Sequence, residues 1–189
     1  MVDDQERFSY MADQIQLQKL FNDKGFPDYR WIDPGEVVVA QWVRIKCMFG
    51  CDIYGRNASC PPNTPSIDEC REFFNGYRLG AVFHFSKSFK DPEERHEWSR
   101  EVNRSLLDLE RSVFISGYPQ AFLLFIDNCK LCRECTSTRV SCRNKRMARP
   151  SPEGMGVDVF ATVKKYGYNI EVLDDYDREM NRYAFLLIE

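Results

Sequence analysis

Four cysteines in one short segment constrain this chain most, because any fold must leave them in a loop able to wrap a metal centre. They are Cys129, Cys132, Cys135 and Cys142, spaced as Cys-x2-Cys-x2-Cys with the fourth after six more residues. Bacterial ferredoxins hold iron–sulfur clusters with a Cys-x2-Cys-x2-Cys run, although their next cysteine follows sooner and binds the other cluster. The longer gap here allows Cys142 to close the same site. Because zinc sites usually take their ligands as two separated pairs, this spacing favours a cluster over zinc.

A second set of cysteines lies earlier in the chain: Cys47, Cys51, Cys60 and Cys70. Glycine and asparagine residues between them allow tight bends, and Pro61 and Pro62 stiffen the chain after Cys60. This composition suits a wrapped loop over residues 47–70 and predicts a second metal centre. The alternative is a set of buried free thiols, because unligated cysteine is common in protein interiors.

Two interpretations of Cys70 stay open. As a fourth ligand it would close the first centre, and a closed centre suits an electron relay. It also shares a helical register with Ile67, Phe73 and Phe74, which is the pattern of a core thiol. In that case the other three cysteines would leave an open coordination position, and the centre would suit a catalyst.

The composition is that of a globular protein with nearly balanced charge. Of 189 residues 43% are hydrophobic, and 26 basic against 29 acidic side chains give a net charge of −3. That balance argues against a nucleic-acid-binding protein, which needs a basic face. The apolar runs 121–126 and 184–188 are too short to span a bilayer. The first residues lack a secretory signal, so we expect a cytoplasmic protein whose cysteines are ligands rather than disulfides.

Apolar patterns and turn signals predict a single compact domain, residues 1–189, of the α/β or α+β class. We expect helices at 9–24, 66–75, 93–115 and 156–166, and strands at 35–47, 79–85, 121–126, 169–173 and 183–188. The clearest helix start is Asp91, an N-cap residue followed by Pro92 and two glutamates. Strands separated by helices predict a mixed sheet with helices packed on it. Both cysteine loops, 47–70 and 129–150, would then follow strand ends, where ligand-binding loops are common.

The second cysteine loop is strongly basic. Seven cations stand against the single acid Glu134: Lys130, Arg133, Arg139, Arg143, Lys145, Arg146 and Arg149. A four-thiolate cluster is negatively charged, so nearby cations would stabilise its reduced form. The same cations would also suit a solvated surface, ion pairs with acids elsewhere, or a docking patch for an acidic redox partner.

The histidines and glycines indicate no further site. His84 alternates with phenylalanines in a predicted strand, which indicates a structural histidine, and His96 lies on the polar face of a charged helix. The segment Gly154-Met155-Gly156 lacks the third glycine and the preceding strand of a dinucleotide-binding motif. We therefore expect no flavin or nicotinamide site, and any metal centre must be mainly thiolate.

Five motifs taken together are specific. They are Trp42-Val43-Arg44-Ile45-Lys46-Cys47, Cys51-x2-Tyr54-Gly55-x4-Cys60-Pro61-Pro62, Leu109-Glu110-Arg111, Cys129-x2-Cys132-x2-Cys135 and Cys142-Arg143-x5-Arg149-Pro150-Ser151-x-Glu153-x2-Gly156-Val157-Asp158-Val159. With them the chain resembles, over nearly its whole length, a family of cysteine-rich predicted metal-binding proteins from anaerobic bacteria and archaea. One departure is Asp127-Asn128, which stands where that family has Gly-Pro. The resemblance implies metal binding through both cysteine groups, as iron–sulfur clusters, and implies no particular reaction.

These observations predict an iron–sulfur protein that holds two 4Fe–4S clusters through all eight cysteines and passes electrons between redox partner proteins. We expect no nucleic-acid or membrane partner. Two alternatives stay open. An open-coordinate cluster at Cys47, Cys51 and Cys60 would make the protein an enzyme that reduces a small molecule. Zinc in place of clusters would make it a structural or trafficking protein.

Overall fold

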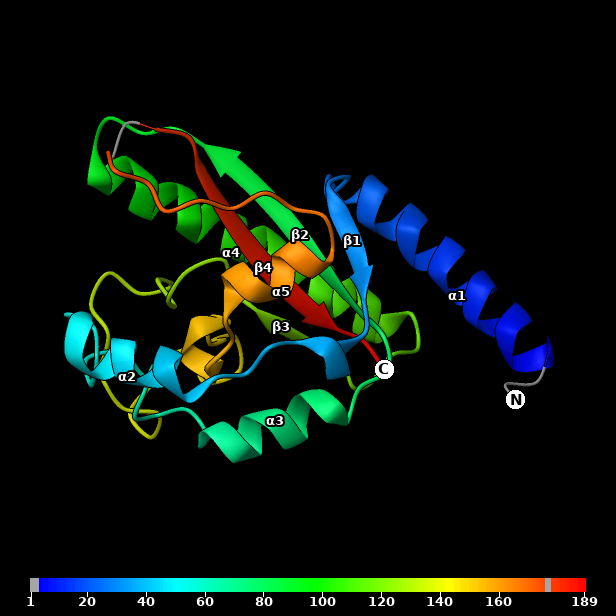
Figure 1. Ribbon diagram of the computed structural model, residues 1–189, viewed down its shortest axis with the longest axis horizontal. Coiled ribbons are helices and arrows are strands. Elements are labelled where there is room, and N and C mark those ends of the chain that lie inside the picture. Colours follow the sequence, from blue (N-terminus) through cyan, green and yellow to red (C-terminus); the bar gives the residue numbers. More distant parts are fainter. Residues whose placement is uncertain (1–3, 176–177) are drawn as a thin grey trace.

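The computed structural model describes residues 4–175 and 178–189, and helices lie on both faces of a central sheet (Figure 1). In chain order the elements are α1 (Asp4–Asp23), β1 (Tyr29–Ile32), η1 (Pro34–Glu36), α2 (Gln41–Gly50), α3 (Ile67–Asn75), β2 (Gly80–Lys87), α4 (Pro92–Ile115), β3 (Phe122–Leu124), η2 (Glu153–Met155), α5 (Val159–Lys165) and β4 (Met180–Leu187). The label η marks a short 3-10 helix.

The strands form one sheet in the order β1-β2-β4-β3, and the neighbouring pairs are antiparallel. The predicted α+β domain is confirmed, with an antiparallel sheet rather than a mixed one. The reason is the position of β4. The strands β2 and β3, which α4 connects, run parallel to each other. They do not pair directly, because β4 lies between them and pairs antiparallel with both.

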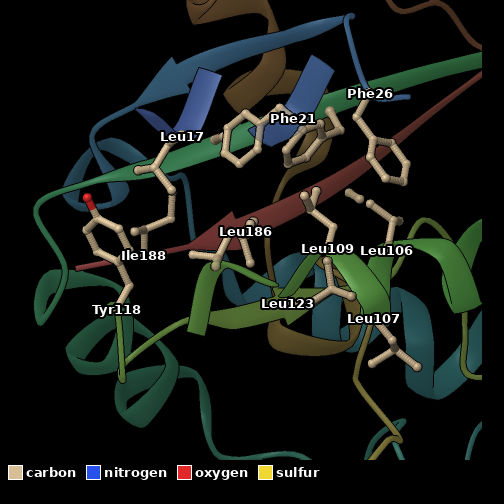
Figure 2. Packing of buried hydrophobic residues seen from close by; sticks show 14 of the residues in the cluster. Leu17, Phe21, Phe26, Leu106, Leu107, Leu109, Tyr118, Leu123, Leu186 and Ile188 are labelled. Carbon is tan, nitrogen blue, oxygen red and sulfur yellow. The ribbon is translucent and has the colours of Figure 1, made fainter. Parts of the chain in front are cut away.

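Each face of the sheet has its own hydrophobic core. On one face α1 and α4 pack against the sheet, and Figure 2 shows Leu17 of α1, Leu109 of α4 and Leu186 of β4 in this core. On the other face α3 and α5 pack through Phe74 and Val163. Buried residues along β4 enter the two cores in turn, because successive strand side chains point to opposite faces.

Local capping signals explain where α3 and α4 begin. Ser66 and Glu69 form a reciprocal capping box, in which the Ser66 backbone N–H donates to the Glu69 carboxylate at 2.7 Å. The Asp91 carboxylate accepts from the Glu93 N–H at 2.9 Å. Both predicted helices are confirmed. No helix within the described ranges is long and apolar enough to cross a membrane.

The strand predicted at 35–47 is wrong. Val39 forms a single bridge to Val157, and α2 begins two residues later at Gln41. This helix packs on η2, where Arg44 Nη2 donates to the Gly154 carbonyl oxygen at 3.3 Å. Tertiary packing of this kind overrides the strand propensity of the valine-rich segment. Cys47 therefore lies in the last turn of a helix and not after a strand.

The strand predicted at 169–173 is also wrong, because these residues form no regular element. Ile170 is buried whereas Val172 is exposed. The apolar pattern that resembles a strand in the sequence therefore belongs to a loop that one apolar side chain anchors. The remaining predicted elements occur with shifted ends. The first helix starts earlier as α1, the 156–166 helix shortens to α5, and the last strand begins earlier as β4.

Candidate metal centre

The second cysteine group lies in an irregular loop that follows β3, as predicted. Residues 125–150 form turns and bends without helix or strand. Two of the thiols in this loop accept hydrogen bonds. Ala58 N donates to Cys135 Sγ at 3.3 Å, and Asn144 Nδ2 donates to Cys132 Sγ at 3.0 Å. Hydrogen bonds to sulfur stabilise thiolate ligands and tune the potential of iron–sulfur clusters.

The thiols of this group lie close enough to influence one another. Burial raises the pKa of the Cys129 thiol, and the Leu131 backbone N–H opposes that rise. The thiols of Cys142, Cys135 and Cys132 raise the same pKa further. The other three cysteines of the group therefore lie in the electrostatic neighbourhood of Cys129, and their role as ligands stays a prediction.

Cys47, Cys51 and Cys60 form a second group of neighbouring thiols. Cys47 lies in the last turn of α2, Cys51 is the C-cap of this helix, and Cys60 is buried in the next loop. Burial raises the pKa of the Cys60 thiol to about 12, with further contributions from Cys51, Cys47, Cys129 and Asp127. A metal cation would reverse this effect, because coordination deprotonates a thiol. Ala58, two residues before Cys60, donates to Cys135 Sγ, so the two cysteine groups are neighbours.

Two asparagine side chains join the cysteine loops into one body. Asn57 Nδ2 donates to the Cys129 carbonyl oxygen at 2.8 Å, and Asn63 Nδ2 donates to the Ser137 carbonyl oxygen at 2.8 Å. The sequence indicates only a bend at Asn57, since a contact over 72 residues leaves no local signal. We call the joined loops, residues 47–70 and 129–150, the cysteine-rich unit.

Cys70 lies apart from the other thiols of its loop. It is fully buried in α3 and packs in the core beside Phe74. Its Sγ lies 3.7 Å from the Pro65 carbonyl oxygen. Burial raises the pKa of this thiol, and its charged neighbours are Arg44 and Glu69 rather than another cysteine. This is the environment of a core thiol, and a ligand role for Cys70 stays a prediction.

The donor chemistry of the cysteine-rich unit fits a group held by thiolates. All eight cysteines are free thiols. Within residues 4–175 and 178–189, no three histidine, cysteine, aspartate or glutamate side chains are arranged around a single metal ion. The unit does provide grouped thiols with N–H donors directed at sulfur, which is the ligand chemistry of iron–sulfur clusters.

The basic residues of the second loop divide into two sets. Arg149 pairs with buried Glu110 of α4 through two contacts of 2.8 Å, and Lys130 Nζ lies 3.5 Å from Asp127 Oδ2. The other five side chains are exposed and form what we call the basic surface: Arg133, Arg139, Arg143, Lys145 and Arg146. The paired set holds the loop to the domain, whereas the side chains of the basic surface face solvent.

Asp127 precedes Cys129 by two residues and also acts electrostatically on Cys60. Its Oδ2 atom is 3.5 Å from both Lys130 Nζ and Arg95 Nη2. Burial alone would raise the pKa of this carboxyl, but Lys130, Arg182 and Arg95 hold it below its usual value. Asp127 is therefore a charged junction between α4, β4 and the second cysteine loop.

A cavity of about 650 Å³ lies beside the first cysteine group, and we call it the β4 cavity. Its walls include Cys47, Cys51, Glu153 and the β4 residues 180–183. It opens where β4 extends past β3, because β3 pairs only with residues 185–187. Sequence patterns could not indicate this cavity, since its walls come from segments that are distant along the chain.

Both histidines are structural or surface residues, as predicted. The His84 ring nitrogens lie 2.7 Å from Asp28 Oδ2 and 2.6 Å from Asn181 Oδ1, and the ring stacks on Tyr183. His96 lies on α4 with its Nδ1 atom 3.6 Å from Glu93. Neither side chain is placed near the cysteine-rich unit by these contacts.

A family model described as predicted metal-binding protein (DUF2284) matches residues 30–188. The matched range contains both cysteine groups and all four strands except the first residue of β1. No curated protein and no solved structure matches the chain significantly. The family match supports metal binding and specifies neither the metal nor a reaction.

Proposed function

This chain belongs to that family of predicted metal-binding proteins, and we propose that it is an iron–sulfur protein with two 4Fe–4S clusters. The cysteine-rich unit carries the proposal, because two groups of thiols lie side by side and two of the sulfur atoms have N–H donors. A donor set made of thiolates with a Cys-x2-Cys-x2-Cys run favours clusters over zinc, which is the second candidate.

The cysteine groups would bind the clusters unequally. The second group offers four thiolates, and Cys47, Cys51 and Cys60 offer three to the first cluster. Because Cys70 lies in the core, we propose that one position of the first site is not filled by a cysteine. Two of its ligands, Cys47 and Cys51, line the β4 cavity. Bound 4Fe–4S clusters supply one-electron redox chemistry at these loops.

The exposed charges support a direction for electron transfer. The basic surface would dock an acidic redox partner beside the second group, since complementary charge accelerates encounter. The first group, next to a cavity, is the place where a small molecule would receive electrons. The proposed function is thus cytoplasmic electron transfer from a protein partner to a molecule bound beside Cys47 and Cys51.

The metal content tests this proposal. Protein purified without oxygen should contain about eight irons and about eight acid-labile sulfides per chain, and it should be brown. Iron, sulfide and zinc are measured on the same sample. Stoichiometric zinc with negligible sulfide would contradict the proposal and favour a structural or trafficking role.

The Cys70→Ser protein should keep its full iron content and an unchanged electron paramagnetic resonance spectrum of the reduced first cluster. A hydroxyl in place of the buried thiol should destabilise the fold by about 1–3 kcal/mol, because it is more costly to bury. Cys60→Ser is the matched control and should lose about half of the iron. Equal iron loss in both variants would show that four cysteines close the first site.

A further inference from the structure

The β4 cavity has the size and the walls of a small-molecule site. Ligand pockets commonly enclose about 300–1,000 Å³, and this one encloses about 650 Å³. Trp42 and Phe160 line it, although they are 49% and 37% exposed. Exposed aromatic side chains at a concave surface are typical of a site that an apolar ligand covers.

Two arginines line the same cavity, and neither has acceptors for all of its N–H groups among the described residues. Arg95 Nη2 lies at the long distance of 3.5 Å from Asp127, and its Nε is buried with no hydrogen-bond partner among the described residues. Arg182 donates to the Met180 sulfur at 3.7 Å, and a thioether is a weak acceptor. Because a guanidinium has five N–H donors, both arginines keep donors for another acceptor.

We propose that the β4 cavity binds a small organic carboxylate. Its carboxylate group would pair with Arg95 and Arg182, and its apolar body would pack against Trp42 and Phe160. A planar guanidinium matches the two oxygens of a carboxylate and forms stronger hydrogen bonds with them than with neutral acceptors. The apolar wall distinguishes such a ligand from an inorganic anion, which would gain nothing from it.

Charged side chains of both signs line the cavity. Arg95 and Arg182 lie near Asp127, and Arg182 also acts on Glu153. Other charged groups on the wall are engaged: Asp158 caps α5 by accepting from Ala161 N, Asp174 pairs with Arg178, and Lys46 lies over the Trp42 ring. A ligand carboxylate would therefore be held by the unused N–H donors of the two arginines and not by a net positive wall.

This inference deepens the proposed function, because Cys47 and Cys51 line the same cavity. A bound carboxylate would lie beside Cys47 and Cys51, two of the three cysteines proposed to hold the first cluster. Only that last step rests on the proposed function, since the arginines and the aromatic wall need no metal to bind an acid.

Isothermal titration calorimetry on the full chain, purified without oxygen and assayed for iron, tests the proposal. The probes are benzoate and hexanoate, the neutral analogues benzamide and hexanamide, and inorganic phosphate. We expect each acid to bind at least about tenfold more tightly than its amide, because the neutral amide cannot form charge-assisted hydrogen bonds with the arginines. Phosphate should bind more weakly than either acid.

Variants separate the two halves of the site. Arg182→Gln should weaken benzoate binding about tenfold and leave benzamide binding unchanged. Trp42→Ala should weaken the binding of both. Arg104→Gln removes an exposed arginine from the helix that carries Arg95, and this control should bind benzoate as the parent does. Arg95→Gln replaces Arg182→Gln if circular dichroism shows that the latter is unfolded.

Equal affinities for acids and amides, or unchanged benzoate binding in Arg182→Gln, would overturn the proposal and leave the arginines as counterions of the metal centres. Tighter binding of phosphate than of either acid would also overturn it. If the purified chain contains no iron but binds benzoate, the proposed function is contradicted and the carboxylate site stands. If the chain contains its full iron but binds no acid, the carboxylate site is contradicted and the proposed function stands.

Discussion

Replacing Cys132 with alanine should remove about half of the iron and make the second cysteine loop sensitive to protease. Iron should fall from about eight to about four per chain, because one cluster loses a ligand. Residues 129–150 contain no helix or strand, so metal binding and the order of this loop should be coupled. The helix α4 packs in the core through Leu106 and Leu109 and should stay protected. Iron assays and mass spectrometry of limited digests measure both effects.

Arg133→Ala is the matched control for Cys132→Ala. Arg133 is an exposed neighbour in the same loop, so this variant should keep its iron and its protection. If the loop of Cys132→Ala resists protease as well as the control, protein contacts order it. The bond from Asn57 to the Cys129 carbonyl oxygen would then be the first such contact to examine.

Replacing Glu110 with alanine should destabilise the protein by about 3–5 kcal/mol, because it leaves a partly buried arginine without its partner. Glu110 is only 6% exposed. Its carboxylate accepts two bonds of 2.8 Å from Arg149 and a third, also of 2.8 Å, from Leu123 N on the outer edge of β3. The loss should appear in the denaturant dependence of circular dichroism, measured on protein with known iron content.

Two controls identify the cause of that loss. Glu101→Ala removes an exposed acid from the same helix and should change stability by less than about 0.5 kcal/mol. The double variant Glu110→Leu, Arg149→Met removes both charges and should recover part of the stability. Full equivalence of the double variant and Glu110→Ala would show that the bond to Leu123 N, rather than the ion pair, carries the effect.

Signals that act over a few residues predicted the fold well. The starts of α3 and α4 follow from Ser66 and Asp91, whose side chains satisfy backbone N–H groups of their own first turns. The α+β class follows from the alternation of such elements. These local signals did not predict the antiparallel pairing. That pairing arises because β4, near the end of the chain, inserts between β2 and β3.

Apolar patterns, which report burial, gave two wrong strand predictions. The valines before α2 have strand propensity, yet contacts with η2 and the bridge to Val157 place them outside the sheet. Alternation at 169–173 reflects one anchored side chain in a loop. A short apolar run indicates that its side chains are buried. The segment that it packs against determines whether it forms a strand, a helix or a loop.

The sequence by itself determined which residues can act as ligands, because the spacing of Cys129, Cys132 and Cys135 is a property of the chain alone. It also determined the charge of the second loop and the caps of the helices. Only the tertiary structure decided that the two cysteine loops join, that Cys70 turns into the core, and that a cavity opens beside Cys47. The physical reason is range: spacing and capping act within a few residues, whereas these three outcomes depend on contacts between segments that approach one another only when the sheet and its helices have packed.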